Sequence, residues 1–229
     1  MPKKIKRNKL LPPAMHDVVY VNSSTYGKHT RAARGSKTPA VVNNILATYA
    51  AKTSALNVAA KSVYDVLKLY SEGFREGQLW QHILSRMRKA ASMNFEDLLY
   101  SLDGLEINSR YALKRFGSVP MLTIQAGRKE VLIEMKPVMP PCLNKHDNCY
   151  QYEIIVLLFN SKGICVQHAV QATGWFNEKE IFNKHVFNFD TPVKVKYYLL
   201  CLALQGGING IARDIFASKG MRIVGASNQ

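Results

Sequence analysis

A chain of 229 residues is long enough to bury a core, either as one large domain or as two small ones. Its 47% hydrophobic and 21% charged residues are typical of a globular protein, which excludes a fibrous or wholly disordered chain. The 31 Lys and Arg residues exceed the 16 Asp and Glu residues by a net charge of +15, which favours an anionic partner: nucleic acid, an anionic membrane surface or an acidic protein.

Residues 1–37 are predicted to form a mostly disordered basic arm, because they show no sustained hydrophobic period. The arm holds nine cations against one acid, Asp17, and therefore a net +8 of the total charge. Only Val18–Val21 has the composition of a strand, and four residues do not decide it. The nine cations are the predicted nucleic-acid-binding residues: Lys3, Lys4, Lys6, Arg7, Lys9, Lys28, Arg31, Arg34 and Lys37.

Residues 38–118 are predicted to form a helical domain that begins with a helical hairpin. Thr38 and Pro39 are typical of a helix start, and apolar residues then recur at gaps of four and three as far as Phe74. A second helix is predicted over residues 78–91, and the short connection predicts that it packs antiparallel on the first. Its polar face carries Arg86 and Lys89.

A third, short helix is predicted to start after Asn94, whose side chain is a good cap, and Asp97 in its first turn favours the helix dipole. From residue 119 to 229 the hydrophobic period changes to two, with strands close together and no helix of any length between them. Gly127-Arg128 and Asn160–Gly163 are predicted to be hairpin turns. The fold class is therefore predicted to be α+β, with a C-terminal antiparallel β-sandwich or partial barrel.

Several segments resemble a family of uncharacterised Bacteroidetes proteins. They are Gly77-Gln78-Leu79-Trp80-Gln81, Ser85-Arg86-Met87-Arg88-Lys89, Gly104-Leu105-Glu106-Ile107-Asn108 with Tyr111, Leu113, Arg115 and Phe116, and Gly220-Met221-Arg222-Ile223-Val224. The resemblance extends from the basic arm onward. It implies no known activity and no catalytic residues.

The segment from Cys142 to Cys149, with His146 between, contains three soft metal ligands within eight residues. Its Cys-x3-His-x2-Cys spacing is not one of the strong zinc patterns, and a polar hairpin loop is the more frequent explanation. No Gly-x-Ser-x-Gly elbow accompanies the histidines, and Gly206-Gly207 lacks both the Walker lysine and the dinucleotide spacing. The sequence therefore predicts no enzyme, no cofactor and no metal.

Four cysteines in a chain of this length do not indicate a disulfide framework. No signal peptide is evident, and no segment approaches the ~18 consecutive apolar residues that a spanning helix needs. We expect a cytoplasmic protein without a transmembrane segment. We also expect a non-enzymatic protein whose arm contacts nucleic acid or a nucleoprotein assembly non-specifically. The alternative is a structural or assembly subunit, virion-like or scaffolding, whose arm binds a protein partner.

Overall fold

The computed structural model describes residues 18–23, 27–32, 44–117, 119–127 and 129–228. The chain divides into two compact units, residues 1–49 and 50–229. In the first unit, β1 (Val18–Ser23) and β2 (Gly27–Ala32) form an antiparallel pair with Tyr20 opposite Thr30. The predicted disordered arm thus contains a two-stranded hairpin, in which Val18–Val21 pairs with the β2 segment.

Helix α1 (Asn44–Tyr70) begins in the first unit and continues into the second. Its sequence contains neither Gly nor Pro, and it ends just before Gly73, whose φ of +72° suits the turn that follows. The buried positions of α1 begin only at Leu56, although the apolar spacing predicts a packed stripe from the start of the helix. Residues 47–55 are exposed on every face. The predicted helix start at Thr38 lies outside the described residues.

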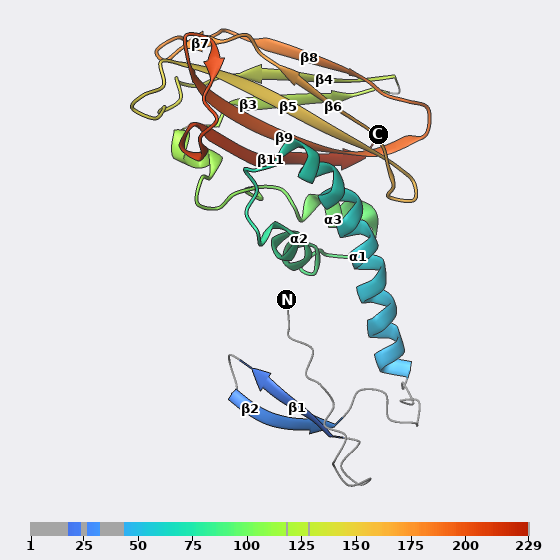
Figure 1. The fold of residues 1–229 in the computed structure, drawn as a ribbon. Coiled ribbons are helices and arrows are strands. Elements are labelled where there is room, and N and C mark those ends of the chain that lie inside the picture. Colours follow the sequence, from blue (N-terminus) through green and yellow to red (C-terminus); the bar gives the residue numbers. More distant parts are fainter. Residues whose placement is uncertain (1–17, 24–26, 33–43, 118, 128, 229) are drawn as a thin grey trace. The chain divides into compact units, whose positions relative to one another are not determined.

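Helix α2 (Leu79–Met87) is shorter than the predicted helix over 78–91, and α3 (Phe95–Tyr100) follows with the predicted cap, since Asn94 accepts the Asp97 N–H at 2.7 Å. The predicted antiparallel helical hairpin is not confirmed. Figure 1 shows α2 nearly along its axis while α1 is seen from the side, so the two do not run alongside each other. The chain between α1 and α2 is tied to the segment after α3, because the Asn108 side chain donates a hydrogen bond to the Phe74 carbonyl.

The β-strands form a curled six-stranded antiparallel sheet and a separate three-stranded one (Figure 1). The centre of the larger sheet is the pair of long strands β5 (Cys149–Asn160) and β9 (Val195–Ile208). Beyond β5 lie β6 (Cys165–Ala172) and β7 (Phe176–Asn177), and beyond β9 lie β10 (Ile211–Ala212) and β11 (Lys219–Asn228). The smaller sheet has the order β3 (Met121–Ala126), β4 (Glu130–Lys136), β8 (His185–Asp190). The predicted mixed α and β content and the antiparallel strands are therefore confirmed.

Both faces of β5 and β9 are buried, which explains why these strands read as continuous apolar runs. Leu157 and Leu199 point into a core shared with the helices, which includes Leu67 of α1 and Ile83 of α2. The alternate residues pack on the three-stranded sheet in a second core, as Leu200 does. Because the helices and the strands share the first core, the predicted boundary between residues 118 and 119 falls inside the compact unit 50–229.

Candidate anion-binding cleft

The helical side of the molecule carries a cleft of about 420 Å³ between α2, the segment after α3, the 3-10 helix η2 (Leu113–Phe116) and β11. Four cationic side chains line it: Arg86, Lys89, Lys114 and Arg222. We call it the basic cleft. The rest of its lining is His82, Ser85, Gly104, Leu105, Glu106 and Ser109. It contains one carboxylate and no Phe, Tyr or Trp.

The first wall of the basic cleft is the polar face of α2. His82, Ser85, Arg86 and Lys89 recur at gaps of three, one and three, which keeps them on one side of the helical path while Ile83 is buried on another. Arg86 donates a hydrogen bond from Nη1 to the Asp103 carbonyl at 3.0 Å, so its guanidinium is held across the gap to the opposite wall. Within the described residues, the other N–H groups of that guanidinium have no hydrogen-bond partner.

The second wall forms because residues 104–107 pair with β11. Gly104 N donates to Ile223 O, Ile223 N to Leu105 O, and Ile107 N to Met221 O, each at 2.9 Å. This pairing places Arg222 directly over Gly104. A Cβ added at Gly104 would lie 3.0 Å from Nη2 of Arg222, and the φ of +75° at this glycine also disfavours any side chain. The glycine therefore permits the approach of the Arg222 guanidinium.

Lys114 enters the basic cleft from η2, and its neighbour Arg115 fixes η2 to the loop before β11. Arg115 Nη2 donates to the carbonyls of Phe216 at 3.2 Å, Ala217 at 2.8 Å and Lys219 at 3.3 Å. Its guanidinium carbon lies 4.8 Å from the centre of the Tyr111 ring. Burial lowers the pKa of Arg115, yet an arginine remains a cation at any physiological pH. Arg115 thus positions Lys114 relative to Arg222 without lining the cleft itself.

The acids at the basic cleft are already engaged by the protein. The Glu106 carboxylate accepts the Leu113 N–H at 2.8 Å. At the rim, hydrogen bonds from the side chain and the backbone N–H of Ser109 lower the pKa of Glu76, which lies 4.0 Å from His82 Nδ1. Within the described part of the chain, no carboxylate forms an ion pair with any of the four cleft cations.

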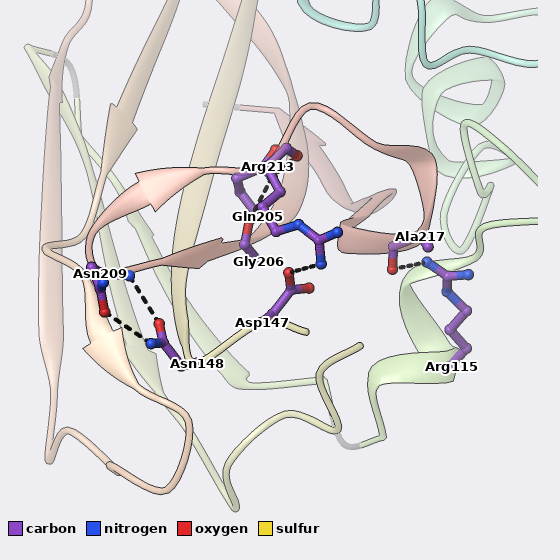
Figure 2. A network of polar contacts seen from close by, with 8 residues as sticks. All are labelled: Arg115, Asp147, Asn148, Gln205, Gly206, Asn209, Arg213 and Ala217. Carbon is purple, nitrogen blue, oxygen red and sulfur yellow. Dashed lines mark hydrogen bonds and ion pairs between the residues drawn. The ribbon is translucent and has the colours of Figure 1, made fainter. Parts of the chain in front are cut away.

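A second group of polar residues lies at the far end of β9, and there the charges neutralise each other (Figure 2). The side chain of Asp147 is fully buried and its Oδ1 is 3.0 Å from Arg213 Nη1. Gln205 donates from Nε2 to the carbonyls of Gly206 and Arg213, and Asn148 exchanges hydrogen bonds with Asn209. We call these residues the Asp147 network. It ties the loop before β5 to the β9–β10 turn.

The predicted metal-ligand segment belongs to this loop. Cys142 is exposed, whereas Cys149 is buried at the start of β5 and its Sγ accepts the Gly210 N–H at 3.3 Å. His146 is exposed. Over the described ranges, no group of three or more His, Cys, Asp or Glu side chains is placed to hold a metal ion.

Of the nine predicted binding residues, the structure describes two. Lys28 and Arg31 lie on β2, where Lys28 is exposed. Lys3, Lys4, Lys6, Arg7, Lys9, Arg34 and Lys37 lie outside the described residues. The basic cleft was not predicted from the sequence, although the polar face with Arg86 and Lys89 was a local signal of it. Lys114 and Arg222 gave no such signal, because strand pairing brings them together from distant parts of the chain.

No protein-family model and no curated protein matches the chain. Among solved structures, it is similar to part of a penta-heme cytochrome c552 from Thermochromatium tepidum, with a TM-score of 0.31 and 9% sequence identity. The match covers 48% of this chain and 38% of the cytochrome chain, so it spans well under two thirds of that protein. A likeness of this size supports no statement about function. In the described ranges, no helix is both long and apolar enough to cross a membrane.

Proposed function

We propose that this protein is a non-enzymatic polyanion-binding protein that holds nucleic acid, or a nucleoprotein assembly, through phosphate contacts of its basic N-terminal segment. The observation that carries the proposal is the excess of positive charge in residues 1–38, which contain nine cations and one acid. Lys and Arg side chains near a polyanion release its condensed counterions, and this entropy gain drives binding without reading sequence.

The chemistry of the folded unit favours the same partner. The lining of the basic cleft has cationic and hydroxyl groups and no Phe, Tyr or Trp, so it supplies phosphate contacts rather than base stacking. Tyr20, about half exposed on the β1–β2 hairpin, is the described aromatic side chain of the N-terminal segment that is open to a base. Binding is therefore expected to depend on salt and hardly on sequence.

The salt dependence of binding tests this proposal. If roughly four to six cations meet phosphates, log affinity falls against log salt with a slope of about −3 to −5, since each contact contributes about −0.7 to −0.9. Changing Lys3, Lys4, Lys6 and Lys9 to Gln should flatten the slope by about 2 to 3. A control with the same loss of charge changes Lys129, Lys145, Lys162 and Lys179, which are exposed in the turns of the folded unit.

The control should leave the slope within about one of the original value. Equal slopes in the two variants would show that net charge alone attracts the ligand. Binding that persists in ~0.5 M salt would mean that shape or base contacts dominate, and the proposal would fail.

A second candidate function, an assembly subunit, is favoured by apolar side chains exposed on α1. Tyr49 is 64% exposed and Val58 is 66% exposed, on a stretch of helix whose other residues are also largely solvent-accessible. Light scattering of nuclease-treated protein separates the two functions. A monomer that forms a complex only with added nucleic acid favours polyanion binding, whereas a defined oligomer free of nucleic acid favours assembly.

A further inference from the structure

We propose that the basic cleft is a phosphate-binding site of the folded unit. The inference deepens the proposed function, on which it rests, by naming the group that the folded unit recognises: one phosphate, from a nucleic acid backbone or from a free phosphorylated molecule.

The first argument is convergence. The four cations come from three separate places: Arg86 and Lys89 from α2 and the turn after it, Lys114 from η2, and Arg222 from β11. Scattered surface lysines on one helix would not enclose an anion. Here opposite walls of one concave site present positive charge, as phosphate binding requires.

The second argument is that one of the cations is held in place. Arg222 only lies beside Gly104, whereas the Arg86 guanidinium is anchored by the Asp103 carbonyl at 3.0 Å. A guanidinium held in this way loses less rotamer entropy when it binds an anion than a free lysine loses. Arginine also suits a phosphate, because its planar fork donates two parallel hydrogen bonds.

The third argument is size and lining. A volume of about 420 Å³ lies within the range of about 300–1,000 Å³ found for small-molecule sites. That space admits a phosphate with the sugar attached to it. The Ser85 hydroxyl, exposed at the same wall, is a further neutral donor. With no Phe, Tyr or Trp in the lining, the site distinguishes the phosphate end of a ligand rather than its base.

The experiment uses the full chain and inorganic pyrophosphate as the probe, titrated at low salt by calorimetry and by amide chemical shifts. The test variant is Lys89→Gln with Arg222→Gln, and the matched control is Lys162→Gln with Lys179→Gln. We expect the test variant to lose at least tenfold in pyrophosphate affinity and the control to lose less than twofold. The shifts should move at residues 82–89, 104–109 and 222. If the double variant unfolds, Lys114→Gln is tested in its place by the same two measurements.

Further experiments distinguish a terminal phosphate from a backbone phosphate, and the cleft proposal from the proposed function. A short single-stranded oligonucleotide with a 5′ phosphate is compared with the same oligonucleotide without it. A preference for the phosphorylated end assigns the site to a terminal phosphate, and equal binding assigns it to the backbone; both support the inference. Unchanged pyrophosphate affinity in the test variants, with shifts elsewhere, overturns it.

The N-terminal variant, with Lys3, Lys4, Lys6 and Lys9 changed to Gln, keeps pyrophosphate affinity if the inference is right. Loss of pyrophosphate binding in that variant alone overturns the inference about the cleft but does not contradict the proposed function. Pyrophosphate binding at the cleft without any nucleic acid binding by the full chain has the opposite meaning: the proposed function fails and a free phosphorylated molecule is the ligand.

Discussion

The Asp147 network and the basic cleft use arginine in opposite ways. Arg213 in the network is 3.0 Å from a buried carboxylate, so its charge is neutralised within the protein. In the cleft, Arg86 and Arg222 have no carboxylate partner among the described residues. The difference teaches which charges hold the fold together. A paired buried charge is a structural element, whereas a group of like charges that forms no ion pair stores repulsion that an anion relieves.

Arg115 lies between these two extremes. It pairs with no acid among the described residues, yet it donates to three backbone carbonyls and contacts an aromatic ring. All three hydrogen bonds come from Nη2, and its charge is not neutralised. It therefore contributes to the fold and also adds positive potential beside Lys114.

The largest effect is expected from the buried carboxylate of the network. Asp147→Ala should lower the free energy of unfolding by about 2–3 kcal/mol, less than the largest losses at buried pairs because Arg213 is 24% exposed and finds water. The measurement is denaturant unfolding. Asp214→Ala is the control, because Asp214 also pairs with a cation, Lys219, but its side chain is 97% exposed. Equal unfolding midpoints for the two variants would contradict a structural role for the network.

A second prediction concerns Gly206, whose Cα faces the same carboxylate. An added methyl group would lie 2.4 Å from Asp147 Oδ2 and 2.9 Å from its Cγ, so Gly206→Ala should cost about 1–3 kcal/mol by displacing that carboxylate from Arg213. Gly174→Ala is the matched control, since a methyl there meets no heavy atom within 4 Å. Thermal melting of both variants checks the prediction, and a control that melts lower than Gly206→Ala would refute it.

A smaller effect is expected at Arg115, a positioning residue. Arg115→Lys keeps the charge but replaces a planar fork with a single ammonium group, so we expect a loss of about 1 kcal/mol in stability. Because η2 also carries Lys114, pyrophosphate affinity should fall by a few-fold with it. Calorimetric titration and melting are measured on the same samples. A loss of stability with unchanged affinity would show that η2 does not position Lys114.

The smallest change in stability is expected in the basic cleft itself. Lys89→Gln and Lys114→Gln should each alter the free energy of unfolding by less than about 0.5 kcal/mol, because exposed cations without partners hold nothing in place. A slight gain in stability would fit this prediction as well as no change, since removing one cation relieves repulsion between the others. Denaturant unfolding at low salt is the sensitive condition. Destabilisation equal to that of Asp147→Ala would mean that the cleft cations are structural.

Local patterns predicted local structure well. The cap at Asn94, the turn at residues 160–163 and the β3–β4 hairpin rest on residues next to one another, and the structure has all three. The period of the apolar residues in α1 predicted a helix but not its partner. That period continues through residues 47–55, where the helix is exposed, because a period reports which residues share a face and not what covers it.

The basic cleft shows more clearly what local sequence patterns fail to predict. Arg86 and Lys89 are visible in the sequence as the polar face of a helix, a pattern that most helices on a protein surface share. Their significance depends on Arg222, which reaches the site only because residues 104–107 pair with β11. Continuous apolar runs at β5 and β9 likewise hide that the two faces of each strand meet different layers.

The shared core also sets an order of events during synthesis. The buried residues of α1, such as Leu67, are covered by strands that include β9 and β11. A ribosome adding about 5–20 residues per second reaches β11 roughly ten to thirty seconds after α1. For that interval the helix can pack on α2, which follows it directly, but not on the strands that complete its core. Nascent chains arrested before β9 should therefore remain sensitive to protease in α1, and resistance should arise abruptly once β11 has emerged.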